Sequence, residues 1–174
     1  MGDIHIRKCD LGDLHQLKEI SIRTFLDTYA HLNSDENVKK HIDQAFNDQQ
    51  LSSELSHPDI SFYFFYFRDE LCGYLKLCRN DTQSEEMSEE YLEIERIYIL
   101  NKFQRKGLGR KMVDHTISVA LNLGKSKVWL GVWKKNPEAV AFYKKVGFSV
   151  FGEHTFTVGA DVQSDWMMEM NLKP

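Results

Sequence analysis

The sequence predicts a mixed α/β fold, in which a single sheet carries helices on its faces. Apolar residues follow a helical period over much of the first 58 residues, and the period changes to that of strands from Ile60 onward. After residue 90, strand and helix patterns alternate and end in a hairpin. No repeat, low-complexity tract or proline-rich linker divides the 174 residues, so we expect one domain, 1–174.

The N-terminal third predicts a short strand followed by helices. The strand reads IHIRKC, and the first helix has apolar residues at roughly helical spacing. Asn33 or Ser34 can cap a second helix, and Pro58 ends a third. The strand is expected over residues 4–9 and the helices over residues 11–32, 33–46 and 48–58.

The rest of the chain predicts two hairpins that enclose an alternating segment. The first hairpin turns at Arg68-Asp69-Glu70 and the last at Gly159-Ala160. The second predicted helix of the alternating segment has Asn136 as its cap, Pro137 at its first position and Gly147 just past its end. Strands are expected over residues 60–79 (a pair), 91–100, 126–135, 148–158 and 161–172, and helices over residues 108–123 and 136–147.

Composition narrows the class of protein. A formal net charge of −4 argues against a nucleic-acid-binding protein, which usually has a basic excess. The longest strongly apolar run, residues 60–67, is too short to cross a bilayer, and the N-terminus lacks the apolar segment of a secretory signal. Three cysteines without metal-ligand spacing indicate reduced thiols in the cytoplasm and no metal site.

Charge is distributed unevenly on the two sides of one predicted strand. Residues 102–111 carry five cations and no acid, whereas residues 85–95 carry six glutamates and no base. Runs of this kind are most often solvated surfaces. Two opposite runs beside one strand would also suit an enzyme that takes one anionic and one cationic reactant.

The turn at residues 104–109, QRKGLG, leads from a strand into a helix and predicts an anion site. Gly107 and Gly109 allow the backbone to approach a ligand closely, and the first N–H groups of the following helix lack intrahelical partners. The helix dipole and the side chains of Arg105, Lys106 and Arg110 add positive charge. A pyrophosphate would satisfy all of these groups, although a glycine-eased turn with surface cations explains the six residues alone equally well.

Two other glycine loops are excluded by their spacing. A P-loop requires G-x-x-x-x-G-K-[ST]. Gly124-Lys125-Ser126 matches the end of this motif, but its first glycine would fall at position 119, which is a valine. The dinucleotide motif G-x-G-x-x-G fails because Gly109 is followed by Arg-Lys-Met.

A second motif makes the sequence recognisable. Residues 136–148, NPEAVAFYKKVGF, match N-x-x-[AS]-x-x-x-Y-x-x-x-G-F and follow the [QR]-x-x-G-x-[GA] turn by about 30 residues. In this order the two motifs resemble those of the GNAT superfamily of N-acetyltransferases, and the resemblance covers nearly the whole chain. The segments LEIERIYILNKFQRKGLG, VWLGVWKKN and GEHTFTVGADVQSDWMMEM are similar to those of PaiA-type spermidine/spermine acetyltransferases.

The resemblance implies a mostly antiparallel sheet with a central parallel pair of strands that splay apart to hold acetyl-CoA. The backbone of Ile97, Tyr98 and Ile99 would pair with the pantetheine arm like an added strand. Residues Gln104, Arg105, Lys106, Gly107, Leu108, Gly109 and Arg110 would hold the pyrophosphate. Asn136 and Lys145 are further candidates for cofactor contacts, with a helix cap and a solvated lysine as the alternatives.

The resemblance also implies roles in the chemistry. Tyr143 matches the tyrosine that acts as an acid beside the sulfur, and core packing is its alternative role. Glu95 is the expected base, with Glu93 as the alternative because strand alternation places both on one side. Asp27 and Tyr29, together with Asp161 and Asp165, are candidates for binding a cationic acceptor.

The expected function is therefore acetyl transfer from acetyl-CoA to a primary amine, with a polyamine as the leading acceptor. A peptide N-terminus or another small amine is the alternative acceptor, and a non-catalytic acetyl-CoA sensor is the alternative from another class. Related folds often dimerise, so a homodimer is an additional expectation.

Overall fold

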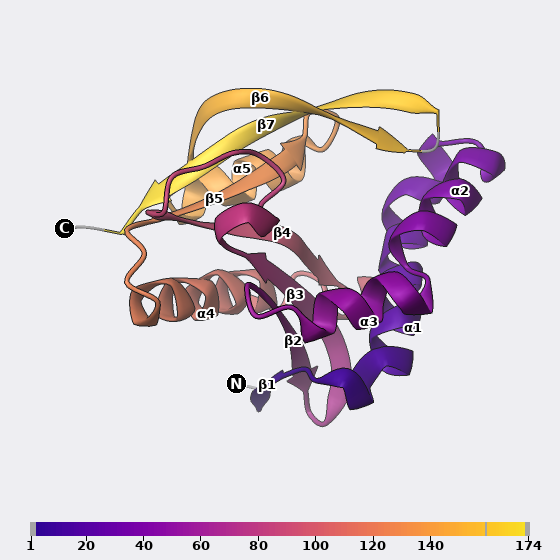
Figure 1. The fold of residues 1–174 in the computed structure, drawn as a ribbon, viewed down its shortest axis with the longest axis horizontal. Helices are drawn as coiled ribbons and strands as arrows, with labels where there is room; N and C mark the ends of the chain where they lie inside the picture. The colour runs from indigo at the N-terminus through magenta and orange to yellow at the C-terminus, as the bar shows by residue number, and fades with distance from the viewer. Residues whose placement is uncertain (1–2, 159, 173–174) are drawn as a thin grey trace.

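The computed structural model describes residues 3–158 and 160–172. It confirms the predicted mixed α/β fold: the strands form one sheet in the order β1-β2-β3-β4-β5-β7-β6 (Figure 1). The strands are β1 (Ile4–Lys8), β2 (Ile60–Phe67), β3 (Glu70–Cys78), β4 (Tyr91–Ile99), β5 (Lys127–Trp133), β6 (Ser149–Val158) and β7 (Asp161–Asn171). The α-helices are α1 (Leu14–Tyr29), α2 (Asp35–Ala45), α3 (Asp48–Ser56), α4 (Leu108–Asn122) and α5 (Pro137–Val146).

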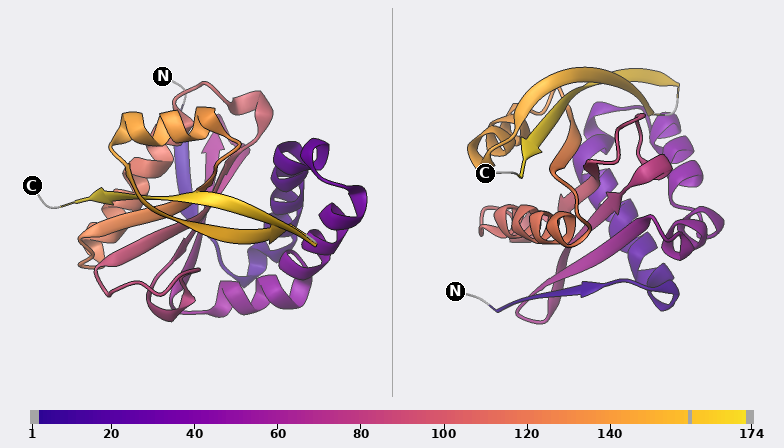
Figure 2. Two further views of the ribbon diagram at one scale, coloured as in Figure 1. Left: turned by 90° about the horizontal axis from the view of Figure 1, so that it is seen from above. Right: turned by 60° about the vertical axis from the view of Figure 1, so that its left-hand side comes forward.

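The helices lie in two groups on opposite sides of the sheet. Helices α1, α2 and α3 cover one side, and α4 and α5 cover the other (Figures 1 and 2). Apolar side chains on both faces of the sheet are buried against these helices, as Leu17 of α1, Phe62 of β2 and Met112 of α4 illustrate. Among the described residues, no helix is both long and apolar enough to span a membrane.

Strands β4 and β5 run parallel, and their pairing stops halfway. Residue pairs extend from Tyr91–Lys127 to Ile94–Leu130, although β4 continues to Ile99 and β5 to Trp133. Over these last residues, β4 remains paired with β3 and β5 with β7. The inner edges of the two strands therefore separate, which leaves backbone groups of both strands facing a gap.

A β-bulge in β4 changes which side chains share a face. Lys76 lies opposite Arg96 and Leu77 lies opposite Ile94, so Glu95 is an extra residue in β4. Glu95 contacts Lys76, and the guanidinium of Arg96 lies over the ring of Phe46 at the end of α2. Glu95 and Arg96 thus both face the α1–α3 side, which strict strand alternation would not allow.

Most predicted element boundaries are confirmed, with three refinements. The predicted helix over residues 11–32 is α1 flanked by two short 3₁₀ turns. Ser34, rather than Asn33, caps α2 by accepting from the N–H of Asn37. The first hairpin turns on Arg68 and Asp69 alone, both with positive φ, because Phe67 already pairs with Glu70.

The hairpin of β6 and β7 reaches from the sheet to α2 (Figure 1). The side chain of Asn37 donates to Asp161 at 2.8 Å and accepts from the N–H of Ala160 at 3.1 Å. The other residue of the predicted turn, Gly159, lies outside the described residues. This hairpin therefore bridges the sheet and the α1–α3 group on the side that Glu95 and Arg96 face.

Candidate functional site

A cavity of about 820 Å³ lies where β4 and β5 separate. Its walls come from β4, the turn before α4, the end of β5, α5 and the end of α1. It brings together most of the residues predicted from the sequence. These are Asp27, Tyr29, Glu95, Ile97, Tyr98, Ile99, Gln104, Arg105, Gly107, Leu108, Gly109, Arg110, Asn136, Tyr143 and Lys145.

The turn before α4 exposes the start of that helix to the cavity. Gly107 precedes the first helical residue with φ of 77°, a conformation that favours glycine, and no described side chain caps the helix there. A Cβ at Gly107 would meet no described atom within 4 Å. The first N–H groups of α4 and the positive end of its dipole thus adjoin open space, which suits an anion.

The cations of the turn differ in where they point. Arg105 and Arg110 line the cavity, although Arg110 also pairs with Asp114 at 3.0 Å. Lys106 is not among the lining residues, and its ammonium lies 6.0 Å from the ring centre of Phe67. Gln104 donates to the carbonyl of Ile99 at 3.3 Å, which ties the turn to the end of β4.

Helix α5 supplies Tyr143, and Asn136 caps its start. Tyr143 is 8 % exposed, and its ring contacts those of Phe142 and Phe148 edge to face. Burial raises the pKa of its hydroxyl, and nearby Tyr29 adds to the shift. The side chain of Asn136 accepts from the N–H of Ala139 at 3.1 Å, so its predicted role as a helix cap is confirmed.

Glu95 lines the cavity and accepts hydrogen bonds from two side chains of β3. Its carboxylate accepts from the ammonium of Lys76 at 2.9 Å and from the thiol of Cys78 at 2.9 Å. Burial acts to raise its pKa, but Lys76 and then Arg96 outweigh burial and hold the pKa below its usual range. Glu95 is therefore a carboxylate at neutral pH.

Glu93 lies on the same face of β4 but does not line the cavity. It is 2 % exposed, and both the N–H and the hydroxyl of Ser84 donate to its carboxylate. Burial raises its pKa to about 7. Glu93 has a pKa better matched to proton transfer at neutral pH, whereas only Glu95 has access to the cavity.

The α1 side of the cavity is aromatic. The hydroxyl groups of Tyr29 and Tyr98 share a hydrogen bond, and the Tyr29 ring lies 5.4 Å from that of Trp133. Asp27 is exposed at this side. Aromatic faces and a carboxylate can both attract a cation.

The other two predicted acceptor contacts are engaged elsewhere. Asp161 holds Asn37 at the tip of the hairpin. Asp165 accepts from His154, whose other ring nitrogen contacts Glu85, and neither aspartate is among the cavity residues. Gly131 of β5 leaves room for this pair, because a Cβ there would lie 2.7 Å from His154 and 2.8 Å from Asp165.

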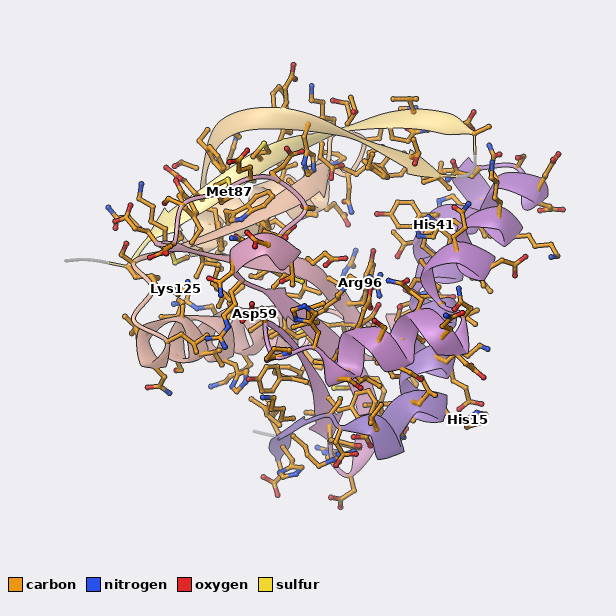
Figure 3. The ribbon with its side chains drawn as sticks, in the orientation of Figure 1. His15, His41, Asp59, Met87, Arg96 and Lys125 are labelled. Carbon is orange, nitrogen blue, oxygen red and sulfur yellow. The ribbon has the colours of Figure 1, made fainter. Side chains whose placement is uncertain are left out.

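The structure adds residues that were not predicted. Arg96 lines the cavity, and its Nη1 is buried without a hydrogen-bond partner among the described residues. Figure 3 shows Arg96 and His41 directed into the space between the sheet and α1–α3. Lys76, the only charged residue within the apolar stretch LCGYLKLC, was a usable signal, because a lysine in such a strand is rarely buried unless it is paired.

Cys78, Glu93 and Glu95 place their ligand atoms within 4.8 Å of one another. Each of the two carboxylates already accepts from protein donors, Glu95 from Lys76 and Cys78 and Glu93 from Ser84. The ammonium of Lys76 already contacts this group, at 2.9 Å from Glu95.

Comparison with known proteins gives a consistent result. The profile of the acetyltransferase (GNAT) family matches residues 14–148. An uncharacterised N-acetyltransferase of Lactobacillus delbrueckii subsp. lactis is 39% identical over 172 residues, 99% of each chain. A spermidine N(1)-acetyltransferase of Thermoplasma acidophilum is 25% identical over 151 residues, 84% of this chain and 89% of that one.

Solved structures share the fold. The PaiA N-acetyltransferase of Thermoplasma acidophilum, crystallised with coenzyme A, superposes with a TM-score of 0.78 at 24% identity, over 97% of this chain and 99% of that one. A probable acetyltransferase of Staphylococcus epidermidis has a TM-score of 0.77 at 14% identity, over 98% and 100% of the two chains.

Proposed function

The chain belongs to the acetyltransferase (GNAT) family and is an N-acetyltransferase, and we propose that it acetylates a primary amine of the polyamine class. We further assign the cavity between β4 and β5 as the site that holds both reactants. The observation that carries this proposal is the separation of β4 from β5 beside the uncapped start of α4.

The cavity fits acetyl-CoA at three points. The N–H groups that begin α4, with Arg105 and Arg110, would hold the pyrophosphate. The unpaired inner edge of β4 at Ile97, Tyr98 and Ile99 would hydrogen-bond the amide groups of the pantetheine arm. Asn136 and Lys145 line the same wall on α5, where they can contact the cofactor.

When bound, acetyl-CoA supplies the acetyl thioester. Tyr143 would hold a proton on its hydroxyl for the departing sulfur, and its raised pKa keeps that proton in place at neutral pH. Glu95, as a carboxylate at the cavity wall, would accept the proton of the attacking ammonium, directly or through a water.

Two features support a polyamine as the acceptor. A 25% identical relative is named a spermidine N(1)-acetyltransferase. Asp27, Glu95 and the aromatic rings of Tyr29 and Trp133 line the acceptor side of the cavity. Carboxylates and ring faces are the groups that bind ammonium ions.

Arg96 favours a second class of acceptor. Its guanidinium stands 3.8 Å from the Glu95 carboxylate, and its Nη1 has no partner among the described residues. The carboxylate of Glu95 beside the guanidinium of Arg96 would suit an amine that also carries a carboxylate, such as an amino acid or a peptide. Lys76 and Arg96 offset the charges of Glu54 and Glu95, and this reduced negative charge near Glu95 favours the second class of acceptor.

Pairs of amines that differ by one carboxylate separate the two classes. Release of free thiol from acetyl-CoA would be followed with spermidine, spermine, putrescine and cadaverine, and with ornithine, lysine and short peptides. A polyamine enzyme turns over spermidine and prefers putrescine to ornithine and cadaverine to lysine. The reverse order would identify a carboxylate-bearing acceptor, and tight coenzyme A binding without any turnover would indicate a sensor.

We place the reaction in the cytoplasm. The three cysteines of the chain, Cys9, Cys72 and Cys78, are free thiols and buried. Burial raises the pKa of the Cys72 thiol to about 11, so this group stays protonated and unreactive. Such thiols are typical of reducing compartments.

A further inference from the structure

Lys76 is a buried lysine whose ammonium lies between two carboxylates. Only 2 % of the residue is exposed, and its ammonium donates to Glu54 of α3 and to Glu95 of β4, both at 2.9 Å. An ammonium buried without partners would cost several kcal/mol, roughly, or lose its proton. The two carboxylates therefore supply the partners that a buried ammonium needs, and Lys76 in turn helps to hold the pKa of Glu95 below its usual range.

The groups that face Glu95 come from three elements. Lys76 and Cys78 of β3 contact it directly. Glu54 of α3 contacts the far side of Lys76, and Glu93 and Arg96 flank Glu95 on β4. The β-bulge makes this arrangement possible, because it turns Glu95 and Arg96 to the same side. Lys76 is the cation with the shortest contact, since Arg96 is 3.8 Å away.

Glu95 separates two cavities, and Lys76 reaches it from behind. Among the described residues, Glu95 lines both the 820 Å³ cavity and a smaller one of about 360 Å³. Lys76 and Glu54 line only the smaller cavity. An acceptor amine can therefore approach Glu95 from one side while Lys76 occupies the other.

We propose that Lys76 is a positioning residue for acetyl transfer: it fixes the Glu95 carboxylate at the cavity wall and holds it as an anion. The proposal rests on the proposed role of Glu95 as the proton acceptor. Lys76 itself touches neither reactant. Its charge also anchors α3 through Glu54, so the same contact connects the α1–α3 group with the site.

Two variants break the Lys76 bridge from opposite sides. Lys76→Met removes the cation from both carboxylates at nearly constant length, whereas Glu54→Gln removes the charge of the other partner and leaves the Lys76–Glu95 pair. Both should lower the unfolding temperature. In Lys76→Met, the acidic limb of kcat/KM should move to higher pH by about one unit or more, because Glu95 loses its main counter-charge. In Glu54→Gln this limb should stay in place or move to lower pH.

The profiles would be measured with spermidine, or with the first amine found to react, so that the ionisation of the acceptor is common to all variants. ¹³C NMR titration of glutamate carboxyl groups, with Glu95 identified by its loss in Glu95→Gln, gives the same shift without turnover. An upward shift in Lys76→Met alone supports the proposal. Equal shifts in both variants, no shift in Lys76→Met, or a folded Lys76→Met that is inactive at every pH would overturn it.

This design distinguishes the two proposals. Failure to acetylate any amine would refute the proposed function, and the NMR titration would still decide whether Lys76 sets the charge of Glu95. Turnover that survives Glu95→Gln would refute the role of Glu95 as the base, again independently of the titration.

Discussion

Tyr143 is fixed by the packing of its ring and shares the cavity with the start of α4. Phe142 and Phe148 contact the ring at centroid distances of 5.2 and 5.7 Å. The hydroxyl has a raised pKa because it is buried, so it is a proton donor at neutral pH rather than a phenolate. The ring thus serves the core, and the hydroxyl is available for the chemistry.

Tyr143→Phe separates these two contributions. The variant keeps the ring, so coenzyme A affinity and unfolding temperature should change little. Turnover should fall by about 10²- to 10⁴-fold, because the proton donor is lost. Calorimetric titration and steady-state kinetics would be compared with Tyr63→Phe, a change at a half-buried tyrosine of β2 outside the cavity. If Tyr143→Phe instead lost stability and coenzyme A affinity but kept its turnover, Tyr143 would be only a core residue.

Strand β4 combines the two irregularities that shape the site. Its inner edge leaves β5 after Ile94, and its bulge at Glu95 reverses the alternation of side chains. The first creates the place for a ligand, and the second brings Glu95 and Arg96 to one face. Both depend on how β4 pairs with its two neighbours.

Local patterns were therefore predictable and the bulge was not. The turn at residues 104–109 and the cap of α5 depend on short stretches of sequence, and the structure confirms that Asn136 caps α5 and that Gly147 lies just past its end. Gly107 and Gly147 both have positive φ. Glu93 and Glu95 were expected on one face by alternation, and they do share it. Arg96 was missed because only the register against Lys76 turns it to that face.

The backbone of β3 lies very close to β4 at Gly73, and a substitution there tests this contact. A Cβ at this position would lie 2.4 Å from the carbonyl oxygen of Tyr98 and 2.7 Å from the side chain of Met112. Gly73→Ala should therefore lower the free energy of unfolding by about 1–3 kcal/mol. It should also weaken coenzyme A binding, because displacing Tyr98 also moves its neighbours Ile97 and Ile99 on the edge of β4 that faces the gap.

Gly152→Ala in β6 is the matched control. Its Cβ would meet only Met167, at 3.7 Å and beyond, so its effect should stay within about 0.5 kcal/mol. Urea denaturation measures both changes. Similar stabilities for the two variants would contradict the close contact between β3 and β4.

At the scale of the whole molecule, the sheet separates two groups of helices, and the cavity lies between them. The α4 and α5 side offers positive charge and the Tyr143 hydroxyl, and the α1 side offers aromatic rings and Asp27. The β6–β7 hairpin connects the sheet with α2 (Figure 2). An anionic donor and an amine acceptor can thus enter from different sides.

Stability should depend on pH through Glu93. Its folded-state pKa of about 7 lies above the ordinary 4.5, so the folded protein binds this proton more tightly than the unfolded chain. The resulting stabilisation is fully present below the ordinary pKa and is lost as pH rises through about 7. It amounts to about 3 kcal/mol at most.

Glu93→Gln removes this dependence and can keep both contacts with Ser84. Urea denaturation at about pH 5 and about pH 8 should show a larger loss of stability in the wild type than in the variant. His154 contributes in the same direction in both proteins, because Asp165 and Glu85 raise its pKa. Identical pH dependence in the two proteins would show that Glu93 does not titrate as described.

The most direct test of the account is the binding of coenzyme A to a pair of glycine variants. Gly107 and Gly124 both have positive φ, of 77° and 72°, and a Cβ at either would meet no described atom within 4 Å. Gly107→Glu and Gly124→Glu therefore impose the same side chain and similar backbone strain at the two ends of α4. By calorimetric titration, Gly107→Glu should lose coenzyme A binding, because it places bulk and negative charge where the pyrophosphate is held, whereas Gly124→Glu should retain wild-type affinity. Undiminished binding in Gly107→Glu, or an equal loss in both variants, would contradict the assignment of this cavity.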